Sequence, residues 1–190
     1  MTRSPEGLHD VGRDFLIKTK QYLEATLVID VPWTVYHDNG MTVLQGLDGK
    51  AHAFDALGML KDGAKRPIYI EAKFRTKSSD INSEYDDFVA ESFSCYVKEQ
   101  WRPNFDPYFM FVTNRPFKTE DYHKLTQTAY LASFLSNLKG KYGVNQATSD
   151  QVEAFKDRLW LVIWSNRQDL MCVSDPSLYK RMAMEGRSLA

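Results

Sequence analysis

The chain has 190 residues, of which 43% are hydrophobic and 26% charged, and its formal net charge is −1. This composition is ordinary for a globular protein and excludes a disordered chain, while the length favours one domain over residues 1–190. Because the whole molecule carries no basic field, any contact with nucleic acid would come from a local basic patch.

Cysteine usage and hydrophobic patterning favour a cytoplasmic protein with no membrane partner. Cys95 and Cys172 lack the spacing of a redox or zinc motif, so we expect buried free thiols in a reducing compartment. The first twelve residues contain no apolar signal-peptide core, and the longest apolar run, residues 159–164, is too short to span a bilayer.

The first third of the chain predicts one helix followed by strands. Hydrophobic residues recur at helical spacing over residues 5–25. Strand-like segments follow, separated by Asn-Gly and Asp-Gly turn signals, which together predict an antiparallel meander. These segments are residues 33–37, 41–46, 50–60 and 66–74.

The hydrophobic period then changes from two to about 3.6. An apolar stripe from Ile81 to Trp101 predicts an amphipathic helix, and Thr119 caps a later helix that runs to Lys139 and ends at Gly140. The order of elements predicts an α/β protein, an αβα sandwich around a central mixed sheet. Its remaining elements are a strand at 107–113, a helix near 150–157, and strands at 158–165 and 169–174.

Three charged residues, Asp55, Glu71 and Lys73, interrupt the apolar strands. An unpaired ion inside a sheet costs several kcal/mol, so such groups persist mainly where they pair, bind metal or perform chemistry. Strand alternation places Glu71 and Lys73 on one face. If the hairpin closes through the loop Asp62-Gly63-Ala64, Asp55 lies opposite Glu71 and the three charges converge. A two-residue turn would instead send Asp55 to the other face.

On these residues the sequence resembles the PD-(D/E)XK nuclease superfamily, which has the restriction-endonuclease-like fold. The resemblance consists of Asp55, fifteen intervening residues and Glu71-Ala72-Lys73, together with the element order from helix 5–25 through strand 107–113. Phe54 stands where the motif has proline, which the superfamily often tolerates. The resemblance implies a metal-dependent nuclease.

The resemblance also implies a role for each residue. Two close carboxylates repel each other, and a hard divalent cation with oxygen ligands relieves that repulsion. Asp55, Glu71 and the carbonyl of Ala72 would therefore bind Mg²⁺, for which Mn²⁺ would substitute. Lys73 would orient the attacking water and offset negative charge in the transition state.

The superfamily often adds an acid from the first helix, and here the match is poor. Asp10 and Asp14 fall beside the apolar stripe, and His9 is no better placed. Glu91, on the helix after the motif, is another weak candidate. For all of these a solvated helix face is the default interpretation.

Local positive charge occurs in two places. Alternate residues at the exit of the motif strand share a face with Glu71 and could contact a phosphate backbone, and a second basic loop follows strand 107–113. Solubilising surface is the alternative for both. The candidates for nucleic-acid binding are Arg75, Lys77, Asn114, Arg115 and Lys118.

The sequence thus predicts a magnesium-dependent endonuclease that hydrolyses phosphodiester bonds, in DNA rather than RNA. The alternative is a catalytically inactive member of the fold that serves as a nucleic-acid or protein-binding subunit. The small size and neutral charge leave little surface to grip a substrate, which suggests a subunit of a mobile-element or phage-defence assembly. A homodimer and a larger complex both remain open.

Overall fold

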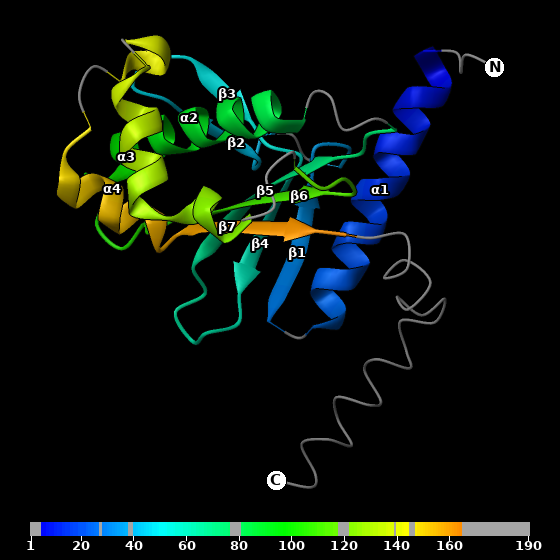
Figure 1. Ribbon diagram of the computed structural model, residues 1–190. Helices are drawn as coiled ribbons and strands as arrows, with labels where there is room; N and C mark the ends of the chain where they lie inside the picture. Colours follow the sequence, from blue (N-terminus) through cyan, green and yellow to red (C-terminus); the bar gives the residue numbers. More distant parts are fainter. Residues whose placement is uncertain are drawn as a thin grey trace, which may run out of the picture.

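The computed structural model describes most of the chain, and its fold is α/β, with a mixed five-stranded central sheet and four helices (Figure 1). For residues 5–9 only the backbone is described. The described ranges are 5–26, 28–37, 40–76, 81–117, 122–138, 140–144 and 147–164.

One face of the sheet is covered by α1 (Pro5–Ala25), the helix predicted from the sequence. Proline is well placed in a first helical turn, where its missing N–H would have no intrahelical partner. Phe15, Leu16 and Leu23 are buried and belong to the same apolar cluster as Ile68 and Ile70 of the sheet. This layer fixes α1 against the strand that carries the charged motif.

The central sheet has the order β1-β4-β5-β6-β7. β1, β4 and β5 pair antiparallel, whereas β6 and β7 continue the sheet parallel to β5. The strands are β1 (Ile29–Thr34), β4 (Ala56–Leu60), β5 (Pro67–Lys73), β6 (Tyr108–Thr113) and β7 (Leu159–Ile163).

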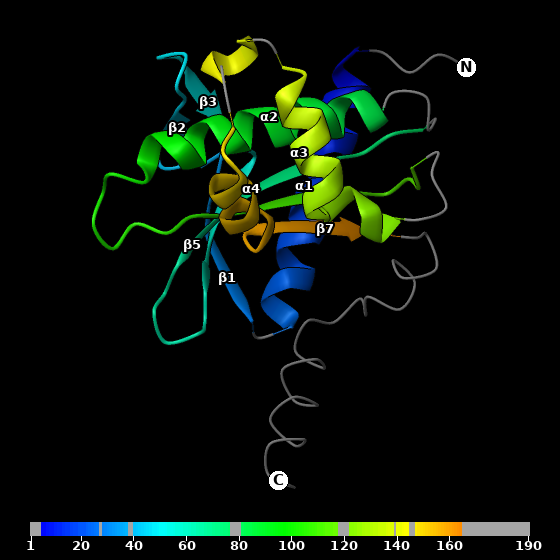
Figure 2. The same cartoon turned by 60° about the vertical axis from the view of Figure 1, so that its left-hand side comes forward.

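The predicted meander is wrong in its pairing. β2 (Val43–Gln45) and β3 (Ala51–Ala53) form a separate two-stranded sheet, and β1 pairs with β4 across that excursion. The two Asp-Gly signals identified the β2–β3 and β4–β5 hairpins correctly, whereas the Asn-Gly signal after β1 does not join paired strands. A turn signal does not determine which strands pair. The β2–β3 hairpin packs beside the second helix instead (Figure 2).

The β4–β5 hairpin has the register on which the predicted charge cluster depends. Ala56 pairs with Ile70 and Leu57 with Tyr69, so continuing the ladder brings Asp55 to the level of Glu71. The loop is longer than the expected three residues, because Leu60 N–H donates to the Arg66 carbonyl at 2.9 Å. It still turns at Gly63, whose φ of 84° lies in the left-handed region that glycine adopts without strain. Lengthening by one residue on each side preserves the facing of every side chain.

The opposite face of the sheet is covered by α2 (Ile81–Glu99), α3 (Thr128–Ser136) and α4 (Ser149–Lys156) (Figures 1 and 2). Aromatic rings dominate the core between them: the Phe155 ring lies 5.4 Å from that of Phe93 and 5.9 Å from that of Phe109. α2 ends two residues before the predicted end, and Trp101 beyond it is 70% exposed rather than buried.

The predicted helix over residues 119–139 is divided. A 3-10 helix, η1 (Tyr122–Thr126), precedes α3, and Gln127 between them is extended, with φ −88° and ψ 150°. Thr119, Lys139, Cys172 and the predicted strand 169–174 lie outside the described residues. The predicted helix at 150–157 is α4, which begins with a capping box formed by Thr148 and Gln151.

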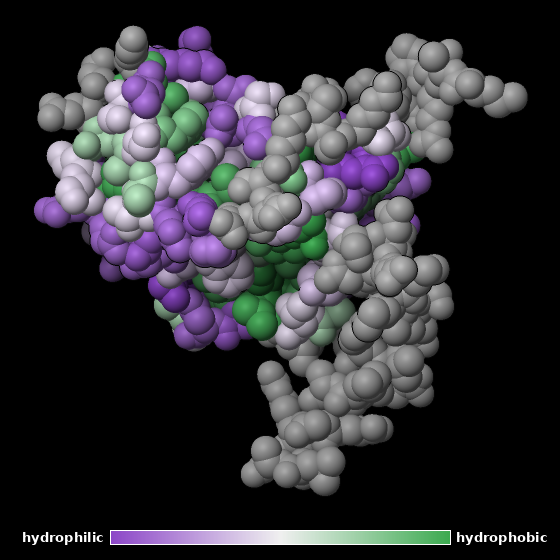
Figure 3. Space-filling view, in the orientation of Figure 1, coloured by the Kyte–Doolittle hydropathy of each residue, from purple (hydrophilic) through white to green (hydrophobic). Residues whose placement is uncertain are grey.

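β7 is an edge strand of the sheet, and hydrophobic residues gather around it on the surface (Figure 3). Leu159 is buried, while Leu161 and Ile163 are half-buried and line a hollow of about 350 Å³ with residues of η1.

Within the described part of the chain, no helix is both long and apolar enough to cross a membrane. Cys95 is a free, buried thiol, as predicted.

Candidate functional site

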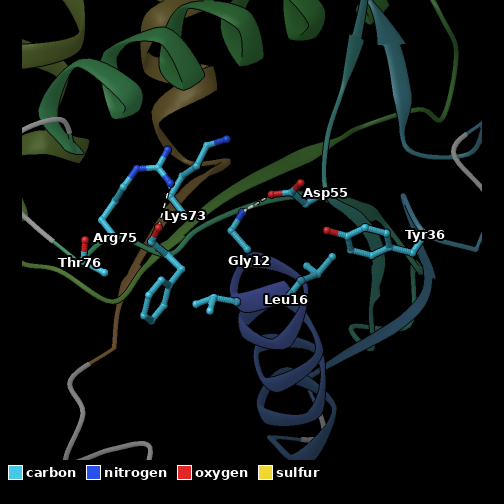
Figure 4. Close-up of a pocket in the computed structure, with 10 residues that line it drawn as sticks. Gly12, Leu16, Tyr36, Asp55, Lys73, Arg75 and Thr76 are labelled. Carbon is cyan, nitrogen blue, oxygen red and sulfur yellow. Dashed lines mark hydrogen bonds between the residues drawn. The ribbon is translucent and has the colours of Figure 1, made fainter. Parts of the chain in front are cut away.

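The three charges of the motif meet at one end of the β4–β5 hairpin. Asp55 immediately precedes β4, and its backbone carbonyl accepts a hydrogen bond from Val35 N–H at 2.9 Å. Its carboxylate Oδ2 accepts a second from Ala72 N–H at 2.8 Å, the dashed line beside Asp55 in Figure 4. Asp55 is therefore held on both sides, by the chain leaving β1 and by β5.

Glu71 and Lys73 lie on the face of β5 that points toward α2. Tyr69, two residues before Glu71, belongs to the apolar cluster on that side, and strand alternation carries Glu71 and Lys73 to the same face. Lys73 Nζ and Glu71 Oε1 form an ion pair, with the two side chains 29% and 16% exposed. The predicted convergence of the three charges is present in the structure.

Electrostatics show that this cluster carries an excess of negative charge. Burial raises the pKa of Asp55, although the Ala72 N–H and the charge of Lys73 oppose the shift. Burial and the charge of Asp55 together raise the pKa of Glu71 to about 7. Burial lowers the pKa of Lys73, but the carboxylates of Glu71, Asp55 and Glu84 together outweigh it, so the net shift is upward and Lys73 stays charged at neutral pH.

This donor set fits a small hard cation. Two carboxylates share one ammonium group in a poorly solvated space, and a divalent ion relieves such repulsion. Mg²⁺ typically takes one or two protein carboxylates together with water and substrate oxygens. Asp55 and Glu71 are suitable ligands, and the backbone of Ala72 lies beside them. In the described part of the chain no group of three His, Cys, Asp or Glu side chains could hold a metal ion, so the fit rests on two carboxylates.

A cavity of about 390 Å³ opens beside the cluster. Asp55, Ala72 and Lys73 line it on the sheet side, and α1 faces them across it (Figure 4). The rest of its wall consists of Val11, Gly12, Leu16, Tyr36, Phe74, Arg75 and Thr76. Asp55 and Lys73 are thus accessible to a ligand in this cavity, whereas Glu71 is not among the residues that line it.

No family model matches the chain, and no curated protein or solved structure is significantly similar to it. The assignment of function therefore rests on the residues themselves.

Among the α1 residues whose side chains the structure describes, none that lines this cavity is acidic. Asp10 and Asp14 are exposed, and the described α1 residues that line the cavity are Val11, Gly12 and Leu16. The side chain of His9 lies outside the described residues. The structure thus agrees with solvated positions for both aspartates.

Glu91 of α2 lies closer to the cluster than the sequence suggested. Burial raises the pKa of Glu91, against the charges of His52 and Lys73, and its own charge adds to the raised pKa of Glu71. His52, from the β2–β3 hairpin, approaches Glu91 with 3.9 Å between Nδ1 and Oε1. Spacing along α2 could not reveal this, because His52 is brought to α2 only by the excursion between β1 and β4.

Three of the predicted nucleic-acid contacts, Arg75, Asn114 and Arg115, form a hydrogen-bonded network with Glu84, which we call the Arg75–loop network. Arg75 N–H donates to Asn114 Oδ1 at 2.7 Å, and Asn114 Nδ2 donates back to the Arg75 carbonyl at 3.0 Å. Arg115 Nε donates to the same carbonyl at 2.9 Å, and Arg75 Nε donates to Glu84 at 2.8 Å. These contacts tie the end of β5 to the loop after β6. Lys77 and Lys118 lie outside the described residues.

Sequence reasoning missed Tyr36. Residues 33–37 read as a strand, but β1 ends at Thr34 and Tyr36 lies in the turn that follows. Tyr36 is 52% exposed and lines the cavity with Asp55 and Lys73. The closeness of the turn at residues 35–37 to the motif is a tertiary property, which local sequence signals do not reveal.

Proposed function

We propose that the protein is a metal-dependent nuclease with a restriction-endonuclease-like fold, which hydrolyses phosphodiester bonds in DNA rather than RNA. One observation carries the proposal: burial raises the pKa of Asp55, burial and the charge of Asp55 raise the pKa of Glu71, and Asp55 and Lys73 line an open cavity. Perturbed carboxylates next to a cleft are characteristic of sites that hold cations or transfer protons.

Asp55, Glu71 and the Ala72 carbonyl would hold Mg²⁺ or Mn²⁺. When bound, such an ion polarises a phosphoryl oxygen and lowers the pKa of a water ligand. The hydrogen bond from Ala72 N–H keeps the Asp55 carboxylate in place without the ion. A site that is held in position before the substrate arrives needs less reorganisation during the reaction.

Lys73 supplies the fixed positive charge of the site. Its raised pKa keeps it protonated at neutral pH, so it can donate hydrogen bonds to the attacking water and to a phosphoryl oxygen. A compact ammonium group stabilises negative charge that develops in the transition state. Lys73 lines the cavity, and a phosphate group that enters there meets it directly.

A second candidate is a catalytically silent binding subunit. The observation that favours it is the direct ion pair between Lys73 and Glu71, which partly neutralises Glu71 without a metal ion. In that case the cluster serves the stability of the hairpin, and cleavage is absent.

A cleavage assay separates the two candidates. The purified protein is incubated with supercoiled plasmid, single-stranded DNA and single-stranded RNA, each in Mg²⁺, Mn²⁺ or EDTA. We expect DNA cleavage in either metal ion, none in EDTA, and none with Glu71→Gln or Lys73→Ala.

The exposed pair of Glu153 and Lys156 on α4 provides matched controls. Glu153→Gln and Lys156→Ala make the same chemical changes away from the cavity and should cleave like the wild type. If the wild type leaves every substrate intact in both metal ions, the nuclease proposal is wrong and the binding subunit is favoured.

A further inference from the structure

Tyr36 is placed beside the charged motif by its own backbone. Val35, the residue before it, donates its N–H to the carbonyl of Asp55 at 2.9 Å. The turn is closed by His37 N–H, which donates to the Thr34 carbonyl at 2.9 Å, and by a 2.7 Å hydrogen bond between Thr34 Oγ1 and His37 Nδ1. Any group bound at Asp55 therefore lies near a ring whose backbone is already ordered.

The Tyr36 ring also has a charged neighbour from α1. The guanidinium carbon of Arg13 lies 5.6 Å from the ring centroid, within the range of a cation–π interaction. A single exposed aromatic side chain is ordinary surface. Tyr36 differs because it combines an exposed ring, an arginine and a place in the wall of the cavity that holds Asp55 and Lys73 (Figure 4).

Gly12 leaves the facing wall open. It lies inside α1, where glycine is less favourable than alanine for helix stability. Close packing is not the reason for a glycine here, because a Cβ at Gly12 would meet nothing within 4 Å. The absent side chain instead leaves space on the cavity side of α1.

From these features we infer that the cavity takes an unpaired nucleotide, with its base stacked on Tyr36 and its phosphate facing Lys73 and Arg13. The inference rests on the proposed nuclease function and narrows its substrate to single-stranded or frayed DNA. A cavity of about 390 Å³ lies at the lower end of the usual range for small-ligand pockets, about 300–1,000 Å³, and suits one nucleotide. A base within a duplex is stacked on its neighbours and does not offer its face to a protein ring.

Binding without cleavage tests this inference. Fluorescence anisotropy with a labelled DNA oligonucleotide, single-stranded and as a blunt duplex, is measured in EDTA and again in Ca²⁺. Stacking of one base on an aromatic side chain predicts that Tyr36→Ala weakens single-strand binding by about five- to 150-fold. Tyr36→Phe keeps the ring and should stay within about twofold of the wild type, and duplex binding should be the same in all three proteins.

Trp101 supplies the matched control. It is 70% exposed and has the Arg102 guanidinium 5.4 Å from its ring, the same pairing as Tyr36 and Arg13 but away from the residues that line the cavity. Trp101→Ala should leave single-strand affinity unchanged. Gly12→Leu introduces a strong helix former into α1 and should weaken single-strand binding by filling the cavity.

Each outcome supports or overturns the inference. It is overturned if the wild type binds duplex as tightly as single strand, if it binds neither, if Tyr36→Ala has no effect, or if Trp101→Ala has the same effect. Metal-dependent cleavage without a Tyr36 effect refutes the stacking and leaves the nuclease. If single-strand binding depends on Tyr36 but neither the wild type nor any variant cleaves DNA, the nuclease proposal is refuted and the stacking stands. If an RNA oligonucleotide of the same sequence binds more tightly than the DNA, the preference for DNA is overturned and the stacking on Tyr36 is not affected.

Discussion

Two charged clusters lie within a few residues of each other at the end of β5, and they differ in the partners of their charged groups. In the Arg75–loop network, the Arg75 guanidinium meets the carboxylate of Glu84, and Arg115 donates to backbone carbonyls. In the motif cluster, Asp55 and Glu71 share the single ammonium group of Lys73. In the network each guanidinium has acceptors within the protein, whereas two carboxylates that share one ammonium group leave negative charge that a cation can balance.

The largest expected contrast between the two clusters is in cleavage. Lys73→Met removes the fixed positive charge and should lower kcat by about 10²–10³-fold, the cost of losing one donor to a developing anion. Arg75→Ala, in the Arg75–loop network, should change kcat by less than about tenfold, because its guanidinium is engaged with Glu84. The two rates are compared on one oligonucleotide under single-turnover conditions. Equal losses in the two variants would place Arg75 in the chemistry.

The next contrast is in the pH dependence of stability. The pKa of Glu71 is raised from 4.5 to about 7 on folding, so the native state binds the proton more tightly than the unfolded state. Stability should therefore fall as pH rises through this interval. Glu71→Gln should unfold at the same denaturant concentration as the wild type near pH 4, and should be more stable by about 2–3 kcal/mol at pH 8 without divalent ions.

Added Mn²⁺ should reverse that order by stabilising the wild type at pH 8 through binding to the native state. Thermal unfolding with and without the ion measures the shift, and Glu153→Gln on α4 should behave as the wild type does. A variant that is less stable than the wild type at pH 8 would mean that the ion pair with Lys73 outweighs the burial of Glu71.

A smaller effect on stability is expected when the Arg75–loop network loses a partner. Arg75→Ala should lower the free energy of unfolding by about 1–2 kcal/mol, a value reduced because the guanidinium is partly exposed to solvent. Arg75→Lys keeps the charge but loses the forked geometry and should recover part of this loss. Urea unfolding at pH 7 measures the stability of both variants. If neither is less stable than the wild type, the network does not contribute to the stability of the fold.

The smallest effect concerns the wall opposite the motif. Gly12→Ala should raise the free energy of unfolding by about 0.5–1 kcal/mol, because alanine is the better helix former and its Cβ meets no neighbour within 4 Å. Urea unfolding checks the gain, and circular dichroism checks that helix content is unchanged. A loss of stability would mean that α1 needs glycine for its backbone geometry.

Local patterns predicted α1, the β4–β5 register and the meeting of Asp55, Glu71 and Lys73, because each depends on residues close in the chain or joined by one turn. The pairing of β1 with β4 was not predicted, since it spans the β2–β3 excursion and depends on how that hairpin packs against α2. The fold is α/β as predicted, whereas its relation to restriction endonucleases stays a proposal.

Whether a residue of the predicted apolar stripe is buried depends on where the helix ends. The stripe of α2 includes Trp101 only if the helix continues beyond Glu99, and because the chain turns there, Trp101 is exposed. Tyr36 and Gly12 could not be identified from the sequence, because neither belongs to a motif. Their importance comes from α1 and the turn after β1 lying on either side of one cavity.

The hydrogen bond from Ala72 N–H to the Asp55 carboxylate makes a single backbone amide a reporter on the motif. Protonation of Asp55, or the arrival of a cation, would change the acceptor that this amide sees. In a ¹H–¹⁵N correlation spectrum the Ala72 cross-peak should therefore move with pH and with added Mg²⁺, which would give a direct reading of the site in the absence of any substrate.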